Sequence, residues 1–145
     1  GYFRALRNNG IEPDERLVRR MEENTWEFSI SSGYQVTKQL LKDNVDFTAL
    51  YACSDYAAIG ACKAIFEAGK SVPGDYSVAG YDGLEIGRYY NPSITTISQP
   101  IHEMLGKTFE LLLDEINGQK SHQTIIFSGK MLIGGSVKRI TDGHE

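Results

Sequence analysis

Residues 76–82 read YSVAGYD and directly follow the turn-forming residues Val72-Pro73-Gly74. The run carries no charge until Asp82, and its length is that of one strand. A short uncharged run of this kind is typical of a buried strand in a parallel sheet. We therefore expect a strand over Tyr76–Tyr81, with Asp82 at its carboxyl end.

The segments before this strand alternate between helix and strand. Asp55–Ala68 repeats small apolar residues on one helical face, and Gly69 provides a stop. Residues 48–53 (TALYAC) form another apolar run of strand length, and Ser31–Asp43 has helical spacing. Alternation with short connections predicts an α/β fold with an open, mostly parallel sheet flanked by helices.

The segments further along the chain extend this pattern. We expect an irregular segment at Gly83–Asn91, a third strand at Ile94–Ile97 and a long helix at His102–Ile116. Two more strands are predicted at Gln123–Phe127 and Met131–Val137. Near the amino terminus, the sequence predicts the end of a helix over Gly1–Asn9, and either a helical turn or a short strand over Leu17–Met21.

The composition excludes several classes of protein. The 145 residues carry 15 Lys+Arg and 19 Asp+Glu, a net charge of −4, and no basic stripe typical of a nucleic-acid-binding surface. No apolar run is long enough for a membrane span. The two cysteines, Cys53 and Cys62, are expected to be reduced core residues, and no CxxC pair suggests zinc. The chain also lacks a signal peptide, so we expect a cytoplasmic domain or a piece of one.

Polar residues follow two of the predicted strands. Ligands of open parallel sheets gather at the carboxyl ends of the strands, where Ser54-Asp55 and Asp82 are expected. Asp55 is favoured as a helix N-cap, with direct ligand contact as the alternative. Asp82 is favoured as a ligand-binding residue, with turn stabilisation as the alternative, because Gly83 follows it and no helix pattern begins there.

Two aromatic residues, Trp26 and Phe28, stand in a polar segment before a helix. They could pack on the base of their own loop or stack on the ring of a sugar or base. Catalytic motifs are missing: there is no Walker loop and no GxGxxG after a strand, and Gly134-Gly135-Ser136 does not complete a nucleophile elbow. The sequence therefore predicts neither an enzyme nor a cofactor or metal site.

Three ordered motifs resemble the lactose-repressor (LacI/GalR) family of transcription regulators. They are residues 55–61 (DYAAIGA), 69–82 (GKSVPGDYSVAGYD) and 92–100 (PSITTISQP). The resemblance implies a periplasmic-binding-protein-like (type I) fold, of which this chain is the C-terminal lobe plus crossover elements. Residues 1–98 would form that lobe, 99–129 would return to the N-terminal lobe, and 130–145 would add a final strand and tail.

The resemblance also implies roles for individual residues. Asp82 matches an aspartate that contacts the effector, Ser54 a polar effector-contacting position that is Asn in some members, and Phe28 an aromatic that stacks on the effector ring. Asp55 is included in the predicted ligand-binding set. The family's effector-binding Arg would lie just before Gly1, and Gly134-Gly135 replaces a residue that is charged in many members.

The function that the resemblance implies is effector sensing by a DNA-binding repressor. We expect a small polar effector, most simply a sugar, a homodimer that uses Gly83–Asn91, and operator DNA bound through a helix-turn-helix outside this chain. The alternative is a periplasmic sugar-binding protein for transport or chemosensing. An enzyme on a doubly wound fold is a third possibility, for which no motif argues.

The helix His102–Ile116 carries a continuous apolar stripe. Its members are Leu105, Phe109, Leu112 and Ile116. Side chains of this size favour burial. We expect the stripe to be covered in any ordered structure, either by another copy of the chain or by residues 1–98.

Overall fold

The computed structural model describes residues 1–20, 30–119 and 123–139. Ten elements occur in these ranges. In order they are α1 (Tyr2–Asn8), the 3-10 helix η1 (Glu15–Leu17), α2 (Ile30–Lys42), β1 (Ala49–Tyr51), α3 (Asp55–Glu67), β2 (Ser77–Asp82), α4 (Glu85–Tyr89), β3 (Thr95–Ser98), α5 (Ile101–Ile116) and β4 (Lys130–Leu132). No helix in these ranges is long and apolar enough to cross a membrane.

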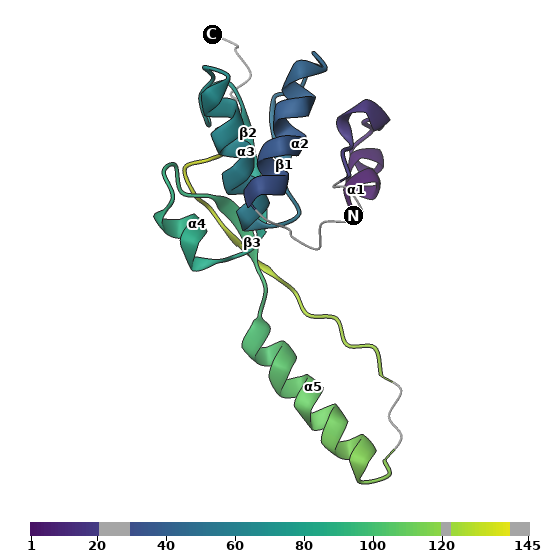
Figure 1. Cartoon of the computed structure of the whole chain (residues 1–145). Coiled ribbons are helices and arrows are strands. Elements are labelled where there is room, and N and C mark those ends of the chain that lie inside the picture. Colours follow the sequence, from purple (N-terminus) through teal and green to yellow (C-terminus); the bar gives the residue numbers. More distant parts are fainter. Residues whose placement is uncertain (21–29, 120–122, 140–145) are drawn as a thin grey trace.

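The strands form one sheet in the order β1-β2-β3-β4. β1 and β3 both run parallel to β2, whereas β4 runs antiparallel to β3. The carboxyl ends of the three parallel strands therefore lie at one edge, where β3 leads towards α5 (Figure 1). The open, mostly parallel α/β sheet predicted from the sequence is confirmed.

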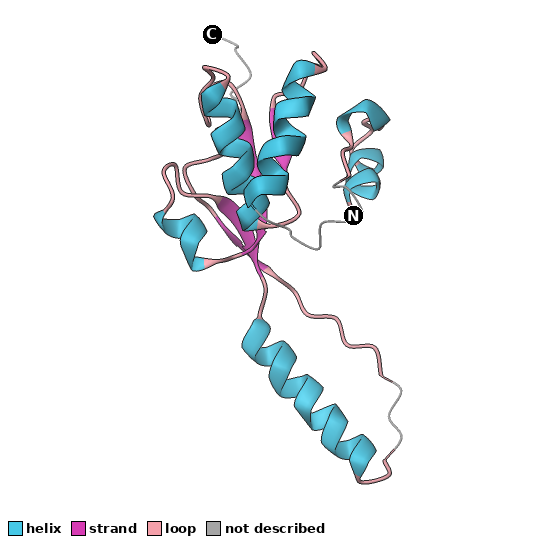
Figure 2. Cartoon of the chain, in the orientation of Figure 1, coloured by secondary structure: helices cyan, strands magenta, loops and turns pink. Residues whose placement is uncertain are grey.

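The core lies between α3 and the sheet, and α2 packs alongside α3 (Figure 2). Ala58, Cys62 and Ile65 of α3 are fully buried, as is Val78 of β2. The two helices cross very closely: a Cβ added at Gly60 would lie 1.9 Å from the carbonyl oxygen of Ile30. The small residues of α3 thus allow the approach that closes the core.

Four local predictions were wrong. Gly83–Asn91 contains the short helix α4, residues 123–127 form no strand, and the last strand is shorter than Met131–Val137. Strand-like patterns at 123–127 do not become strands here because no described strand lies beside them to pair with. Cys53 is exposed rather than in the core, because it lies just beyond the end of β1; Cys62 is buried, and burial raises the pKa of its thiol to about 12.

The helix α5 stands apart from the sheet (Figure 1). None of its residues is buried, and the stripe residues Leu105, Phe109, Leu112 and Ile116 are 51–70% exposed. The described part of residues 1–98 therefore does not cover the stripe, contrary to one of the two expectations, and cover by another copy of the chain stays a prediction. β3 leads into α5 with only two residues between them, and residues 123–129, which precede β4, have no regular secondary structure, so the described part of neither connection folds α5 back onto α2 and α3.

Candidate functional site

Asp82 is the last residue of β2 and lies half-buried at the carboxyl edge of the sheet. Its Oδ1 accepts a hydrogen bond of 2.7 Å from Nε2 of Gln99, and its backbone oxygen accepts one of 3.3 Å from the Gln99 amide. Burial raises the pKa of the Asp82 carboxyl, the Gln99 hydrogen bond opposes this rise, and the nearby Asp55 carboxylate adds to it. The site thus holds a carboxylate tied to the segment that leads into α5.

The backbone turns sharply after this carboxylate. Asp82 has φ +112° and Gly83 has φ +76°. The amide of Gly83 donates to the Thr96 hydroxyl at 3.3 Å, which holds the turn against β3. A non-glycine residue with positive φ costs on the order of 1–3 kcal/mol, and such strain persists only where the surroundings impose it. An observed outlier at the end of a strand is a reason to infer function there.

Ser54, rather than Asp55, is the N-cap of α3. The Ser54 hydroxyl is the N-cap of α3, because its Oγ accepts a 3.1 Å hydrogen bond from the Ala57 amide. The prediction that Asp55 caps this helix is wrong by one residue. Asp55 is instead the first helical residue, fully buried, and its Oδ2 accepts a 2.6 Å hydrogen bond from the Leu84 amide.

Sequence reasoning missed three neighbours of Asp82. Tyr51 is the last residue of β1 and Cys53 lies two positions further on, and both are exposed. Burial of part of each side chain, together with the charge of Asp82, raises the pKa of the Tyr51 phenol and of the Cys53 thiol, so both are neutral at pH 7. Gln99 is the third. The rule that found Asp82 also finds Gln99, because Gln99 directly follows β3.

The side chains at this edge are of the types that suit a polar ligand. The edge combines a hydrogen-bonded carboxylate, a neutral phenol and an amide, which suit hydroxyl groups and ring faces. Among residues 1–20, 30–119 and 123–139 there is no cluster of three potential metal ligands. Phe28, the predicted stacking residue, and Trp26 lie outside the described residues.

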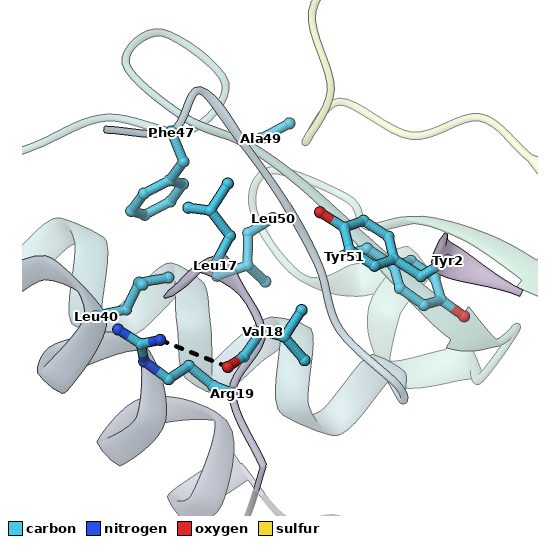
Figure 3. Close-up of a pocket in the computed structure, with 9 residues that line it drawn as sticks. All are labelled: Tyr2, Leu17, Val18, Arg19, Leu40, Phe47, Ala49, Leu50 and Tyr51. Carbon is cyan, nitrogen blue, oxygen red and sulfur yellow. Dashed lines mark hydrogen bonds between the residues drawn. The ribbon is translucent and has the colours of Figure 1, made fainter. Parts of the chain in front are cut away.

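A separate cavity of about 230 Å³ runs along the lateral edge of β1 (Figure 3). Most of the residues that line it are apolar, and Leu17, Leu40 and Leu50 are among them. Arg19 also lines it, and its guanidinium donates a 3.5 Å hydrogen bond to the Val18 carbonyl oxygen. The cavity reaches Tyr51 but not Asp82. Because it does not include Asp82, the carboxyl edge remains the candidate ligand site.

An open, mostly parallel sheet with a carboxylate at a strand end is typical of one class of protein, the α/β ligand-binding proteins. The chain belongs to the periplasmic binding protein-like domain family, whose model matches residues 1–137. The resemblance to LacI/GalR regulators is thereby confirmed, since both the curated relatives and the structural neighbours are regulators of that kind.

Three similar proteins illustrate the relationship. The HTH-type transcriptional regulator MalR of Clostridium butyricum is 37% identical over 132 residues, which cover 91% of this chain and 38% of MalR. The regulator CelR in complex with cellobiose superposes with a TM-score of 0.84 at 29% identity, over 93% of this chain and 40% of CelR. A LacI-family regulator from Enterococcus faecium with bound ribose has a TM-score of 0.80 at 32% identity, over 97% of this chain and 50% of that one.

The chain thus spans about two-fifths of the length of the curated relatives that it matches. The matched part corresponds to the periplasmic binding protein-like domain, and the similar structures named above are transcriptional regulators. The periplasmic transport protein is accordingly the weaker of the two functions that the sequence left open.

Proposed function

We propose that this chain is the effector-binding and dimer-forming part of a DNA-binding transcriptional repressor. The observation that carries the proposal is the carboxylate of Asp82, which lies at the carboxyl edge of the sheet and is bonded to Gln99 at the exit towards α5. A ligand that binds Asp82 therefore acts at the point where the chain leaves the sheet. The protein would work by binding rather than catalysis.

The effector is a small polyhydroxylated molecule, most simply a sugar. A carboxylate accepts hydrogen bonds from ligand hydroxyls, and these charge-assisted bonds are the stronger ones. Cellobiose and ribose are the ligands bound to two of the similar regulators. Four residues form the proposed site: Asp82, Phe28, Ser54 and Asp55. Asp82 and Phe28 would contact the effector directly, whereas Ser54 and the buried Asp55 would hold the edge in place through their hydrogen bonds.

The mechanism is a population shift between two relative orientations of two lobes. Residues 1–98 would belong to one lobe, 99–129 to the other, and 130–145 would return to the first. Effector bound between the lobes favours one orientation by its differential affinity, and the spacing of the DNA-binding heads changes with it. The net charge of −4 agrees with DNA contact outside this chain.

The dimer partner is a second copy bound through α4. Two large apolar side chains of this helix face solvent, Ile86 at 42% and Tyr89 at 82% exposure. Exposed aromatic residues of this size are enriched at protein interfaces. Tyr89→Asp in the full-length protein is expected to raise the dimer dissociation constant at least tenfold by sedimentation equilibrium, whereas an equal change at the exposed Tyr2 is not.

Full-length protein and a randomised duplex library test the function as a whole. We expect selection of a palindromic operator, and a change of at least tenfold in operator affinity on saturation with one sugar from a panel that includes cellobiose and ribose. A protein that binds sugar but selects no DNA would support the transport alternative. A protein that converts the sugar would refute the binding function.

A further inference from the structure

Asp55 is a fully buried carboxylate for which neither of the predicted roles accounts. It neither caps α3 nor reaches the exposed edge. Its Oδ2 accepts the 2.6 Å hydrogen bond from the Leu84 amide, and its Oδ1 has no hydrogen-bond partner among the described residues. A buried carboxylate with one unpaired oxygen is unfavourable by itself, although the amino end of α3 stabilises its charge. We therefore asked which part of the structure the single hydrogen bond of Asp55, to the Leu84 amide, holds in place.

The surroundings of Asp55 bring three elements together. The side chain starts on α3 and lies against β2, because a Cβ added at Gly80 would fall 2.3 Å from its Oδ1. It also approaches α4, since a Cβ added at Gly87 would lie 3.8 Å from the Asp55 Cβ. Glycine at position 80 is therefore what leaves room for the carboxylate.

The bond to Leu84 falls between the candidate site and α4. Leu84 is the N-cap residue of α4, and its side chain provides no cap hydrogen bond to that helix. Asp82 and Gly83, both with positive φ, immediately precede it. Two hydrogen bonds thus hold this turn. The Gly83 amide donates to the Thr96 hydroxyl, and the next amide, that of Leu84, donates to the Asp55 carboxylate.

We propose that Asp55 is a positioning residue whose carboxylate sets the turn of Asp82 and the start of α4 together, and so couples the candidate effector edge to the exposed face of α4. The inference rests on the proposed function only in naming that edge and that face. A displacement of Asp82 moves Leu84, and Leu84 carries the first turn of α4 with Ile86. The coupling needs no contact between Asp55 and the effector.

The test compares Asp55→Ala with Asp55→Asn in the full-length protein. Asp55→Ala removes the acceptor, and we expect hydrogen exchange at the Leu84 amide to become at least tenfold faster and the dimer dissociation constant to rise at least tenfold. The Asn side chain keeps an acceptor oxygen, so Asp55→Asn is expected to retain both values within about threefold. Rescue by Asn separates the hydrogen bond from the charge.

Ser136→Ala is the matched control. The Ser136 side chain is also fully buried and hydrogen-bonded, to Val78 and Thr95, at the opposite end of β2. We expect it to lower stability without faster exchange at Leu84. Equal effects of Ser136→Ala, unchanged exchange in Asp55→Ala, or failure of Asn to rescue each overturn the proposal. Sugar and DNA are absent from these measurements. A wrong α4 dimer would appear as an unchanged dimer dissociation constant in Tyr89→Asp, whereas a wrong role for Asp55 would appear as unchanged exchange at the Leu84 amide in Asp55→Ala.

Discussion

Asp82 shows how a single residue can serve both the fold and the site. Its backbone is held in an unfavourable conformation, and its carboxylate is partly withdrawn from water yet bonded to Gln99. Each of these features has a cost that the neighbouring hydrogen bonds from Gly83 and Gln99 offset. The carboxylate is therefore already oriented before any ligand arrives, which lowers the entropic cost of binding.

Asp82→Ala in the full-length protein is expected to weaken effector binding by roughly 1.5–3 kcal/mol, the range for hydrogen bonds to a charged group. Calorimetry with the sugar that responds in the operator experiment measures it. Asp75→Ala is the matched control, because the Asp75 carboxylate bonds only within its own turn, to Ser71. Equal affinity of Asp82→Ala and wild type would remove Asp82 from the site.

Ionisation of Asp82 should also be visible in the pH dependence. Burial raises the folded-state pKa of the Asp82 carboxyl above 3.8, its ordinary value in an unfolded chain, so the folded state binds the proton more tightly than the unfolded chain. The associated stabilisation is complete below 3.8 and is lost as the pH rises through the folded-state pKa. Effector binding needs the carboxylate and should strengthen over the same interval.

Carbon-13 NMR titration of the Asp82 carboxyl measures this pKa. Asp55→Asn should lower it, because Asp55 contributes to the rise. A pKa at or below the ordinary value of an aspartate carboxyl in wild type would contradict the partial burial of Asp82.

At the scale of elements, the packing of α2 on α3 requires a glycine in α3, whereas the glycine in α5 meets no steric requirement. Gly60 lies in α3 against the backbone of Ile30, whereas a Cβ at Gly106 in α5 would meet no atom within 4 Å. The two helical glycines are otherwise alike in being interior to their helices. They therefore separate the steric requirement from helix propensity.

Gly60→Ala is expected to lower the free energy of unfolding by about 1–3 kcal/mol or more, because the methyl group must push α2 away from α3. Gly106→Ala should instead raise helix stability by about 0.4–1 kcal/mol, since it removes backbone freedom without a clash. Urea unfolding of the full-length protein, followed by circular dichroism, compares the two. A stabilising Gly60→Ala would contradict the close helix crossing.

At the scale of the whole molecule, α5 is the helix whose apolar stripe no described residue of this chain buries. Its stripe exposes Leu105, Phe109, Leu112 and Ile116, and burial of each is worth roughly 1.5–3 kcal/mol. Together they approach the net stability of a small domain, about 5–15 kcal/mol. An exposed apolar face of this kind favours association or a further lobe.

We predict that residues 99–129 are the most protease-sensitive part of the 145-residue chain in dilute solution, and that they become protected in the full-length protein. Limited proteolysis with mass spectrometry compares the two. Leu105→Ser with Phe109→Ser should suppress any concentration-dependent association of the 145-residue chain. Resistance of 99–129 in a dilute monomer would contradict their assignment to a second lobe.

Local patterns in the sequence were sufficient for the parallel sheet, the helices α2, α3 and α5, and the position of Asp82. These features follow from apolar periodicity and from the rule that strand ends carry ligands, both of which act over a few residues. The cap of α3 was misplaced by one residue because Ser54 and Asp55 are both good caps, and only the bond to Ala57 distinguishes them.

The tertiary structure decided what depends on residues far apart in the chain. Asp55 and Leu84 are 29 positions apart, and Asp82 and Gln99 are 17 apart, so no local pattern predicts either bond. Residues 123–127 have a strand-like pattern without a strand, because a strand needs a neighbour to accept its backbone hydrogen bonds. Local propensity depends on neighbouring residues. Hydrogen-bond pairing and burial depend on partners that only the folded chain brings close.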